Sequence, residues 1–191
     1  MGRSTSPQAL SEADRRTVAA WAADCAEHAL PLFEAEAPDD LRARDAIARA
    51  RAFARGELDA AGEIRRRFVA GRAAASAQTP AGVAAARAAA QASGVAHMGA
   101  HALGAAAYAA KAAAYAAKAA GLAAAPDRSE VADADATDAE VAWQLAQLSP
   151  EVRAALRQLP PLGENSSGPL GPGLLASGVL GEVIRRIQAC L

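Results

Sequence analysis

The segment "AAAYAAKAAAYAAKAAG" (Ala105–Gly121) contains the unit AAAYAAK twice in tandem. Because alanine is the strongest helix former, the segment predicts one long helix from about residue 95 to residue 120. Gly121 is suited to end it. Seven residues make nearly two helical turns, so the second copy stays within about 20° of the face of the first. The paired side chains of the two copies are Tyr108 with Lys111 and Tyr115 with Lys118.

Caps and hydrophobic periodicity predict further helices on both sides of this segment. Ser11 is a suitable N-cap, and Val18, Trp21 and Cys25 follow it on one helical face, with Pro31 ending or bending that helix. Further helices are expected over about 41–55, 59–75, 80–92, 138–148 and 150–159, and from Pro172 onward. No stretch alternates like a strand. The sequence therefore predicts an all-α, alanine-rich, single-domain bundle of about seven or eight helices without a β-sheet.

Three segments are expected to lie outside the helices. Residues 1–10 read as a disordered lead, which leaves residues 11–191 as one helical domain. Residues 124–137 are polar and acidic and are interpreted as a loop. The stretch "LPPLGENSSGPLGPG" (Leu159–Gly173) contains too much proline and glycine for regular structure.

Composition limits how such a bundle is held together. The chain has 191 residues, of which 52% are hydrophobic but only 4% aromatic. Alanine contributes much of the hydrophobic count, and each buried alanine removes little area from water. We therefore expect closely spaced helices whose stability depends on a few large residues, namely Trp21, Phe33, Phe53, Phe68 and Trp143.

Charge and cysteine content argue against several classes of protein. The net charge is −1, which favours neither a membrane nor nucleic acid as partner. Nine arginines lie between residues 42 and 72; they are interpreted as a solvated face, and a DNA-associated protein remains a third alternative. Two cysteines without metal or redox spacing and a first segment without an apolar core favour a cytoplasmic location.

The first candidate site is a stripe on the predicted long helix. Its six side chains fall in a band about 100° wide, which suits a protein interface, an anionic ligand or only a solvent face. The pair at i, i+4 that begins the stripe lacks a further metal ligand, so no metal, cofactor or catalytic residue is predicted. The stripe consists of His97, His101, Tyr108, Lys111, Tyr115 and Lys118.

The second candidate site is the acidic segment that follows. A cluster of carboxylates can face a basic partner and speed its association. Cys25 and His28 share a helix face but are expected to be a packed core pair rather than a nucleophile and its base. The acidic candidates are Asp133, Asp135, Asp138 and Glu140, within a run that begins at Asp127 and includes Glu130.

Four long strings resemble a family of bacterial immunity proteins that is common in actinobacteria. They are "DRRTVAAWAADCAEHALPLFE" (Asp14–Glu34), "ARDAIARARAFARGE" (Ala43–Glu57), "AHMGAHALGAAAYAAKAA" (Ala96–Ala113) and "LSPEVRAALRQLPPLGENSSGPLGPGLLASG" (Leu148–Gly178). The resemblance extends from about Asp14 to Gln188, and the second tyrosine–lysine copy departs from the family pattern.

The resemblance implies an all-helical, non-enzymatic protein that neutralises a toxin of a polymorphic toxin system. We therefore expect stoichiometric binding to a toxin domain, with a homo-oligomer also open. The alternative is a helical small-molecule-binding or resistance protein with a His/Tyr-lined pocket. Burial separates the two hypotheses, because a stripe open to solvent favours a protein partner and a stripe lining a cavity favours a ligand.

Overall fold

The chain is helical throughout its regular parts. The computed structural model describes residues 6–124 and 129–191, apart from the side chains of residues 66–68, 124 and 129–132. No strand occurs among these residues, which confirms the predicted all-α class. The elements are α1 (Glu12–Glu34), α2 (Arg42–Ala54), α3 (Ala60–Gly71), η1 (Arg72–Ser76), α4 (Pro80–Gly94), α5 (His101–Ala124), α6 (Ser129–Ala146), α7 (Pro150–Leu156), η3 (Leu174–Ala176) and α8 (Gly178–Ala189).

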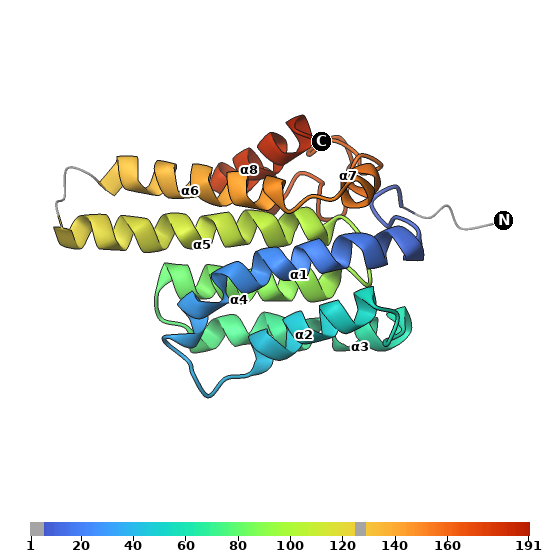
Figure 1. The fold of residues 1–191 in the computed structure, drawn as a ribbon, viewed down its shortest axis with the longest axis horizontal. Helices are drawn as coiled ribbons and strands as arrows, with labels where there is room; N and C mark the ends of the chain where they lie inside the picture. The colour runs from blue at the N-terminus through green and yellow to red at the C-terminus, as the bar shows by residue number, and fades with distance from the viewer. Residues whose placement is uncertain (1–5, 125–128) are drawn as a thin grey trace.

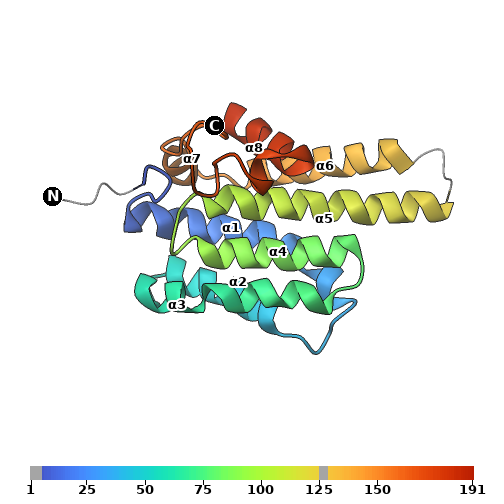
Figure 2. The same cartoon turned by 180° about the vertical axis from the view of Figure 1, so that it is seen from behind.

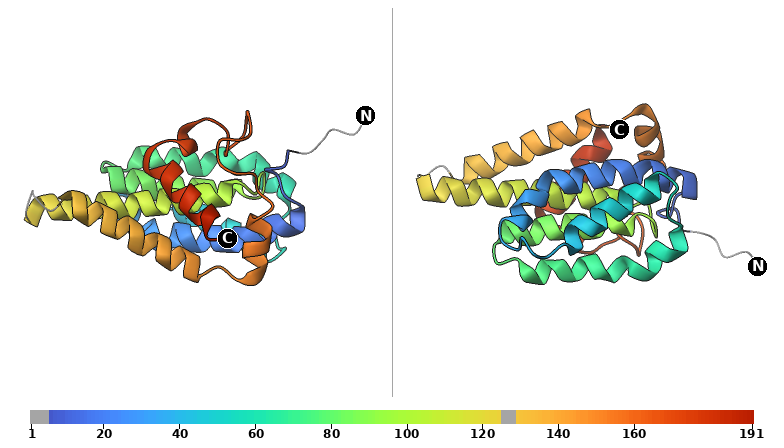
Figure 3. Two further views of the ribbon diagram at one scale, coloured as in Figure 1. Left: turned by 90° about the horizontal axis from the view of Figure 1, so that it is seen from above. Right: turned by 60° about the horizontal axis from the view of Figure 1, so that its bottom comes forward.

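Helix α5 runs through the middle of the molecule. It packs against α1 and α4 on one side and against α6 and α8 on the other, while α2 and α3 form an outer layer (Figure 1). The view from behind shows the same order of layers (Figure 2). The end of α5 and the start of α6 project together beyond the other helices (Figure 3). The predicted central helix is therefore the element on which the two sides of the bundle meet.

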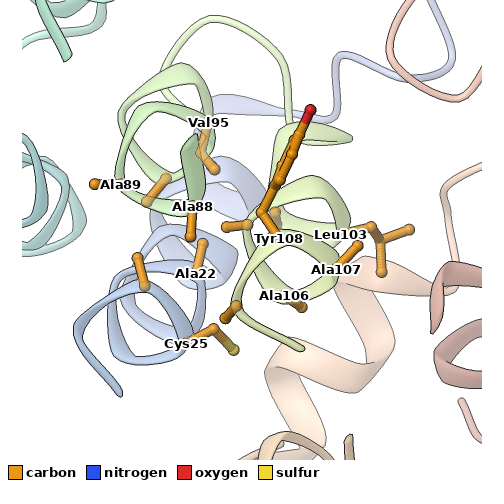
Figure 4. Packing of buried hydrophobic residues seen from close by; sticks show 14 of the residues in the cluster. Ala22, Cys25, Ala88, Ala89, Val95, Leu103, Ala106, Ala107 and Tyr108 are labelled. Carbon is orange, nitrogen blue, oxygen red and sulfur yellow. The ribbon is translucent and has the colours of Figure 1, made fainter. Parts of the chain in front are cut away.

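Small side chains fill the contact between α1, α4 and α5. Ala22, Ala88 and Ala106, one from each helix, are completely buried, and Figure 4 shows them gathered beside Cys25. Alanine at such contacts allows helix axes to approach to about 8 Å, the short end of the usual range. The repeated alanines of the sequence thus serve close packing as well as helix formation.

Large side chains stabilise the core around this alanine contact. Trp21, Phe33 and Phe53 are all buried, as predicted. Trp143 is partly exposed instead, and the predicted core position of Phe68 lies outside the described side chains. Trp21 also donates its indole N–H to the backbone carbonyl of Gln144, 3.0 Å away, which ties α1 to α6.

Side-chain caps start the helices where the sequence predicts them. Ser11, Thr79 and Ser149 each accept a hydrogen bond from the backbone N–H three residues later, which satisfies a donor that the helix leaves unpaired. Helix α1 continues through Pro31 to Glu34. Helix α2 has no capping side chain at its first residue, although Asp40 accepts from the N–H of Arg42.

The expectation of a disordered lead is wrong for residues 6–10. Gln8 is buried, its amide nitrogen lies 2.6 Å from the Ser167 carbonyl, and its amide oxygen accepts the N–H of Leu170. The glycine-rich loop offers backbone groups that no helix or strand pairs, and one glutamine side chain satisfies two of them. Residues 1–5 lie outside the described part of the chain.

The acidic segment is not a loop in its described part. Residues 129–137 belong to α6, because alanines separate the acids and because carboxylates are favoured in the first turns of a helix. The last helix was expected from Pro172 onward, but α8 begins only at Gly178, and a short 3₁₀ helix, η3, precedes it. Ser177 between them has an extended backbone, which separates the two elements.

Candidate functional site

The predicted stripe does not lie on one helix. His97 belongs to the turn before α5, which begins at His101. The N–H groups of Gly99 and Ala100 donate to the carbonyls of Ala9 and Gln8. In a helix that began before His97, these two N–H groups would instead donate to carbonyls of the same helix. The premise that six side chains share one helix face is therefore wrong at its first member.

His101 is held inside the structure rather than presented on it. Its Nδ1 lies 2.8 Å from Oε1 of Gln91 on α4. Since that oxygen can only accept, Nδ1 carries the proton. Burial, together with the neighbouring His97, lowers the pKa of His101 to about 4. A Cβ on Gly94 would lie 2.9 Å from the imidazole, so glycine there makes room for the ring.

The middle of the stripe lines a cleft between α4 and α5. The cleft has a volume of about 280 Å³. Tyr108 is only 4% exposed, whereas Lys111 and Tyr115 are partly buried. Two cations lie over the two rings, with Arg87 Cζ 5.9 Å from the centre of Tyr108 and Lys111 Nζ 5.4 Å from the centre of Tyr115. Each tyrosine ring of α5 therefore has one cation beside it, Arg87 from α4 for Tyr108 and Lys111 from α5 itself for Tyr115.

Lys118, the last member of the stripe, lies outside this cleft. It is exposed, and its Nζ is 4.0 Å from a carboxylate oxygen of Asp133 on α6. The two copies of the duplicated unit thus have the same sequence but different surroundings. Lys111 faces an aromatic cleft, and Lys118 faces an acid of the neighbouring helix.

The four acidic candidates are scattered rather than gathered. Asp138 forms an ion pair of 2.6 Å with Arg186 of α8, and Asp133 faces Lys118. Asp135 is exposed, and Glu140 is buried. Asp127 and the side chain of Glu130 lie outside the described part of the chain. Of the four candidates, only Asp135 is therefore both exposed and without an ion pair to another residue that the structure describes.

Glu140 belongs to a polar network between α1, α5 and α6. One oxygen lies 2.7 Å from Nδ1 of His28, and the other accepts from the amide of Gln144 at 2.9 Å. The same amide donates to the carbonyl of Ala106 at 3.0 Å. Charged and amide groups buried in this way are costly unless they are paired, so the network fixes the register between these helices.

His28 was expected in the core, and this prediction is wrong. Its ring stacks on Trp143 with centroids 3.9 Å apart, and 46% of its side chain is exposed. The sequence contains a signal for this placement, because Asp24 and Pro31 lie four residues before and three residues after His28, on the same helix face. Cys25 is buried as expected, and burial raises the pKa of its thiol well above the usual range, which disfavours a nucleophilic thiolate.

The His28–Trp143 pair borders a second open cleft, of about 360 Å³, between α1 and α6. Asp24 and Glu27 line it, and Arg51 of α2 reaches both carboxylates at 2.6 Å. We call this the α1–α6 cleft. Sequence inspection did not bring its residues together, because they come from three helices.

Among the described residues, no group of three or more His, Cys, Asp or Glu side chains is placed to hold a metal ion. Each helix in this part of the chain is also too short or too polar to cross a membrane. His97 and His101, which the sequence places at i, i+4, do not share a helix, and their ring centres are 6.4 Å apart. The Nδ1 of His101 is already engaged by Gln91.

The structure thus holds His28, His101 and the Cys25 thiol in internal contacts and leaves two clefts lined by aromatic and charged side chains. Residues 8–151 match the family described as "Imm-5 like putative immunity protein". The chain therefore belongs to this family, which supports an immunity role, a protein partner and a non-catalytic mode of action. Helix α8 and η3 lie beyond the matched residues. No curated protein matches the chain, and no solved structure does.

Proposed function

We propose that the chain protects the cell that produces it by binding a toxin of a polymorphic toxin system in the cytoplasm, one molecule to one. The observation that carries this proposal is the family match over residues 8–151. Immunity by binding needs an accessible, rigid surface and no reacting group. The engaged histidines and the buried Cys25 thiol are consistent with that requirement.

The α1–α6 cleft is the surface that best fits a toxin. Tryptophan is enriched among the residues that dominate binding energy at interfaces, and Trp143 is held in place by its stack on His28. Carboxylates of Asp24 and Glu27 border this pair, and Asp135 is exposed on the same helix as Trp143. This combination suits a toxin with a basic active face, such as one that binds nucleic acid.

The first experiment tests neutralisation itself. The secreted protein encoded beside this gene, or its C-terminal toxin domain, is expressed in a host with and without this chain. The proposal predicts restored growth and a one-to-one complex in size-exclusion chromatography with light scattering. Toxicity that persists with the chain abundant and folded, together with no complex, rules the proposal out.

A second experiment tests the surface. Trp143→Ala removes the aromatic anchor and should weaken the complex by about 30-fold or more, in line with interface hot spots. Asp135→Lys should mainly slow association and reduce its salt dependence. Glu57→Lys makes the same charge change at the exposed turn after α2, away from this cleft, and serves as the control. Equal effects of the two charge reversals would remove Asp135 from the proposed interface, and an unchanged affinity of Trp143→Ala would remove the α1–α6 cleft.

A further inference from the structure

The cleft between α4 and α5 has the size of a small-ligand site. Its volume of about 280 Å³ approaches the lower end of known small-molecule pockets, roughly 300 Å³. Pro80, Val83 and Ala84 of α4 form an apolar side, and Tyr108 and Tyr115 of α5 face it. A flat ligand with a single aromatic ring fits these dimensions.

The first observation that points to a ligand is the hydroxyl group of Tyr108, which has no hydrogen-bond partner among the described residues. Its side chain is more than nine-tenths buried, yet its hydroxyl has no hydrogen-bond partner in residues 6–124 and 129–191. Figure 4 shows the ring rising from α5 with the hydroxyl directed away from Ala22 and Cys25. The ring is buried, but its hydroxyl is not among the buried unpaired polar atoms of the described residues, so it opens onto the cleft as a free donor and acceptor. The cleft that Tyr108 lines is the place from which a ligand can supply this bond.

The second observation that points to a ligand is that two cations beside the cleft have no carboxylate partner among the residues that the structure describes. Neither Arg87 nor Lys111 has a carboxylate within 4 Å in the described part of the chain, and both lie beside the tyrosine rings of the cleft. No acid lines the cleft, and Glu36, which lies beside it, already accepts the backbone N–H groups of Gln78 and Thr79.

The cleft therefore has an excess of positive charge beside a tyrosine hydroxyl that has no protein partner among the described residues.

We propose that the α4–α5 cleft binds a small aromatic carboxylate. Its carboxylate would accept hydrogen bonds from Lys111, Arg87 and the Tyr108 hydroxyl, and its ring would pack against Tyr115 and the apolar side of α4. This site is separate from the α1–α6 cleft and does not depend on toxin binding. Charge-assisted hydrogen bonds supply affinity, and the aromatic wall selects for a flat ring.

The duplicated heptad separates this site from a general attraction of anions to lysine. Lys118 is the counterpart of Lys111, but it is exposed and faces Asp133. Its position on the same helix face, seven residues further on, makes it a matched control. A ligand held by the cleft depends on Lys111 alone, whereas a diffuse effect of charge depends on both lysines equally.

Benzoate is the probe, and benzamide, which has the same shape without the charge, is its control. Titration of the ¹⁵N-labelled full chain should move amide signals of α4 and α5 around the cleft, with a Kd on the order of 1 mM for a ligand of this size. Benzamide should bind at least fivefold more weakly. Acetate should also bind at least fivefold more weakly, because it lacks the ring. Benzoate shifts confined to other surfaces, or equal affinity for benzamide, would overturn the proposal.

Three variants locate the contacts. Lys111→Gln and Tyr108→Phe should each weaken benzoate binding about fivefold, the loss of one hydrogen bond or one partly exposed charge contact. Lys118→Gln should leave the Kd unchanged. Tyr108→Phe should also leave the unfolding midpoint of the free protein unchanged, because the hydroxyl has no protein partner among the described residues. A Kd that responds equally to the two lysine variants, or not at all to Tyr108→Phe, contradicts the site.

Discussion

The buried histidine on α5 makes the stability of the fold depend on pH. His101 has a folded-state pKa of about 4, against about 6.5 in an unfolded chain. Between pH 6.5 and pH 4, His101 is therefore mostly protonated in the unfolded state and mostly neutral in the folded state. The stability that neutral His101 contributes is lost as pH falls toward 4. Each pH unit in this window costs up to about 1.4 kcal/mol.

Replacing His101 by glutamine removes the titrating group and should flatten this dependence. The free energy of unfolding of the wild type, minus that of His101→Gln, should fall by about 2 kcal/mol between pH 7.5 and pH 5. This window stays above the range in which most carboxylates are protonated. Urea unfolding followed by tryptophan fluorescence measures both proteins, since Trp21 is buried in the folded state.

His97→Gln is the matched control, because His97 is the exposed neighbour. It removes only a secondary cause of the lowered pKa, so most of the pH dependence should survive. A direct check is the chemical-shift titration of the His101 ring in the folded wild type, which needs no variant. A constant difference between wild type and His101→Gln, or a ring that titrates near pH 6.5, would refute the reasoning.

Three further predictions concern the packing of the helices. Gln144→Ala should lower the free energy of unfolding by about 2–3 kcal/mol, because it leaves buried partners of the amide unpaired; a urea-measured loss below about 0.5 kcal/mol contradicts this. Gly104→Ala would place a Cβ 2.4 Å from Oε1 of Gln91 and should cost about 1–3 kcal/mol by the same assay, whereas Gly71→Ala, with open space around it, should not destabilise. Gln8→Ala should cost about 2 kcal/mol and speed amide exchange in the loop at residues 163–171; unchanged exchange there would show that Gln8 does not hold the loop.

Local signals predicted most of the helices correctly. Ser11, Thr79 and Ser149 cap helices where the sequence places them, because a cap acts within four residues of chain. The start of α5 was missed because its cause is not local: residues 8–9 bond to the N–H groups at 99–100. The packing of Gln8 against the loop at Ser167 was missed for the same reason.

The candidate site was only partly predictable. The spacing of Tyr108, Lys111 and Tyr115 correctly placed them along one side of α5, and all three line one cleft. Helical periodicity does not say which neighbour covers that side, so it gave no sign that Arg87 of α4 completes the cleft. Arg87 was nevertheless detectable as the only charged residue in α4. The assembly of His28 with Trp143 needed coordinates, since 115 positions separate the two residues.

The projecting end of α5 and α6 affects where insertions and deletions can occur during the evolution of this sequence. Gain or loss of one seven-residue unit lengthens or shortens α5 by about 10 Å and leaves the orientation of every preceding side chain untouched. Beyond Tyr115 the neighbour of the helix is α6, which projects with it, and residues 118–120 are all exposed. This tip is therefore the part of the molecule in which insertions and deletions are tolerated, while the buried alanines nearer the centre resist any added atom.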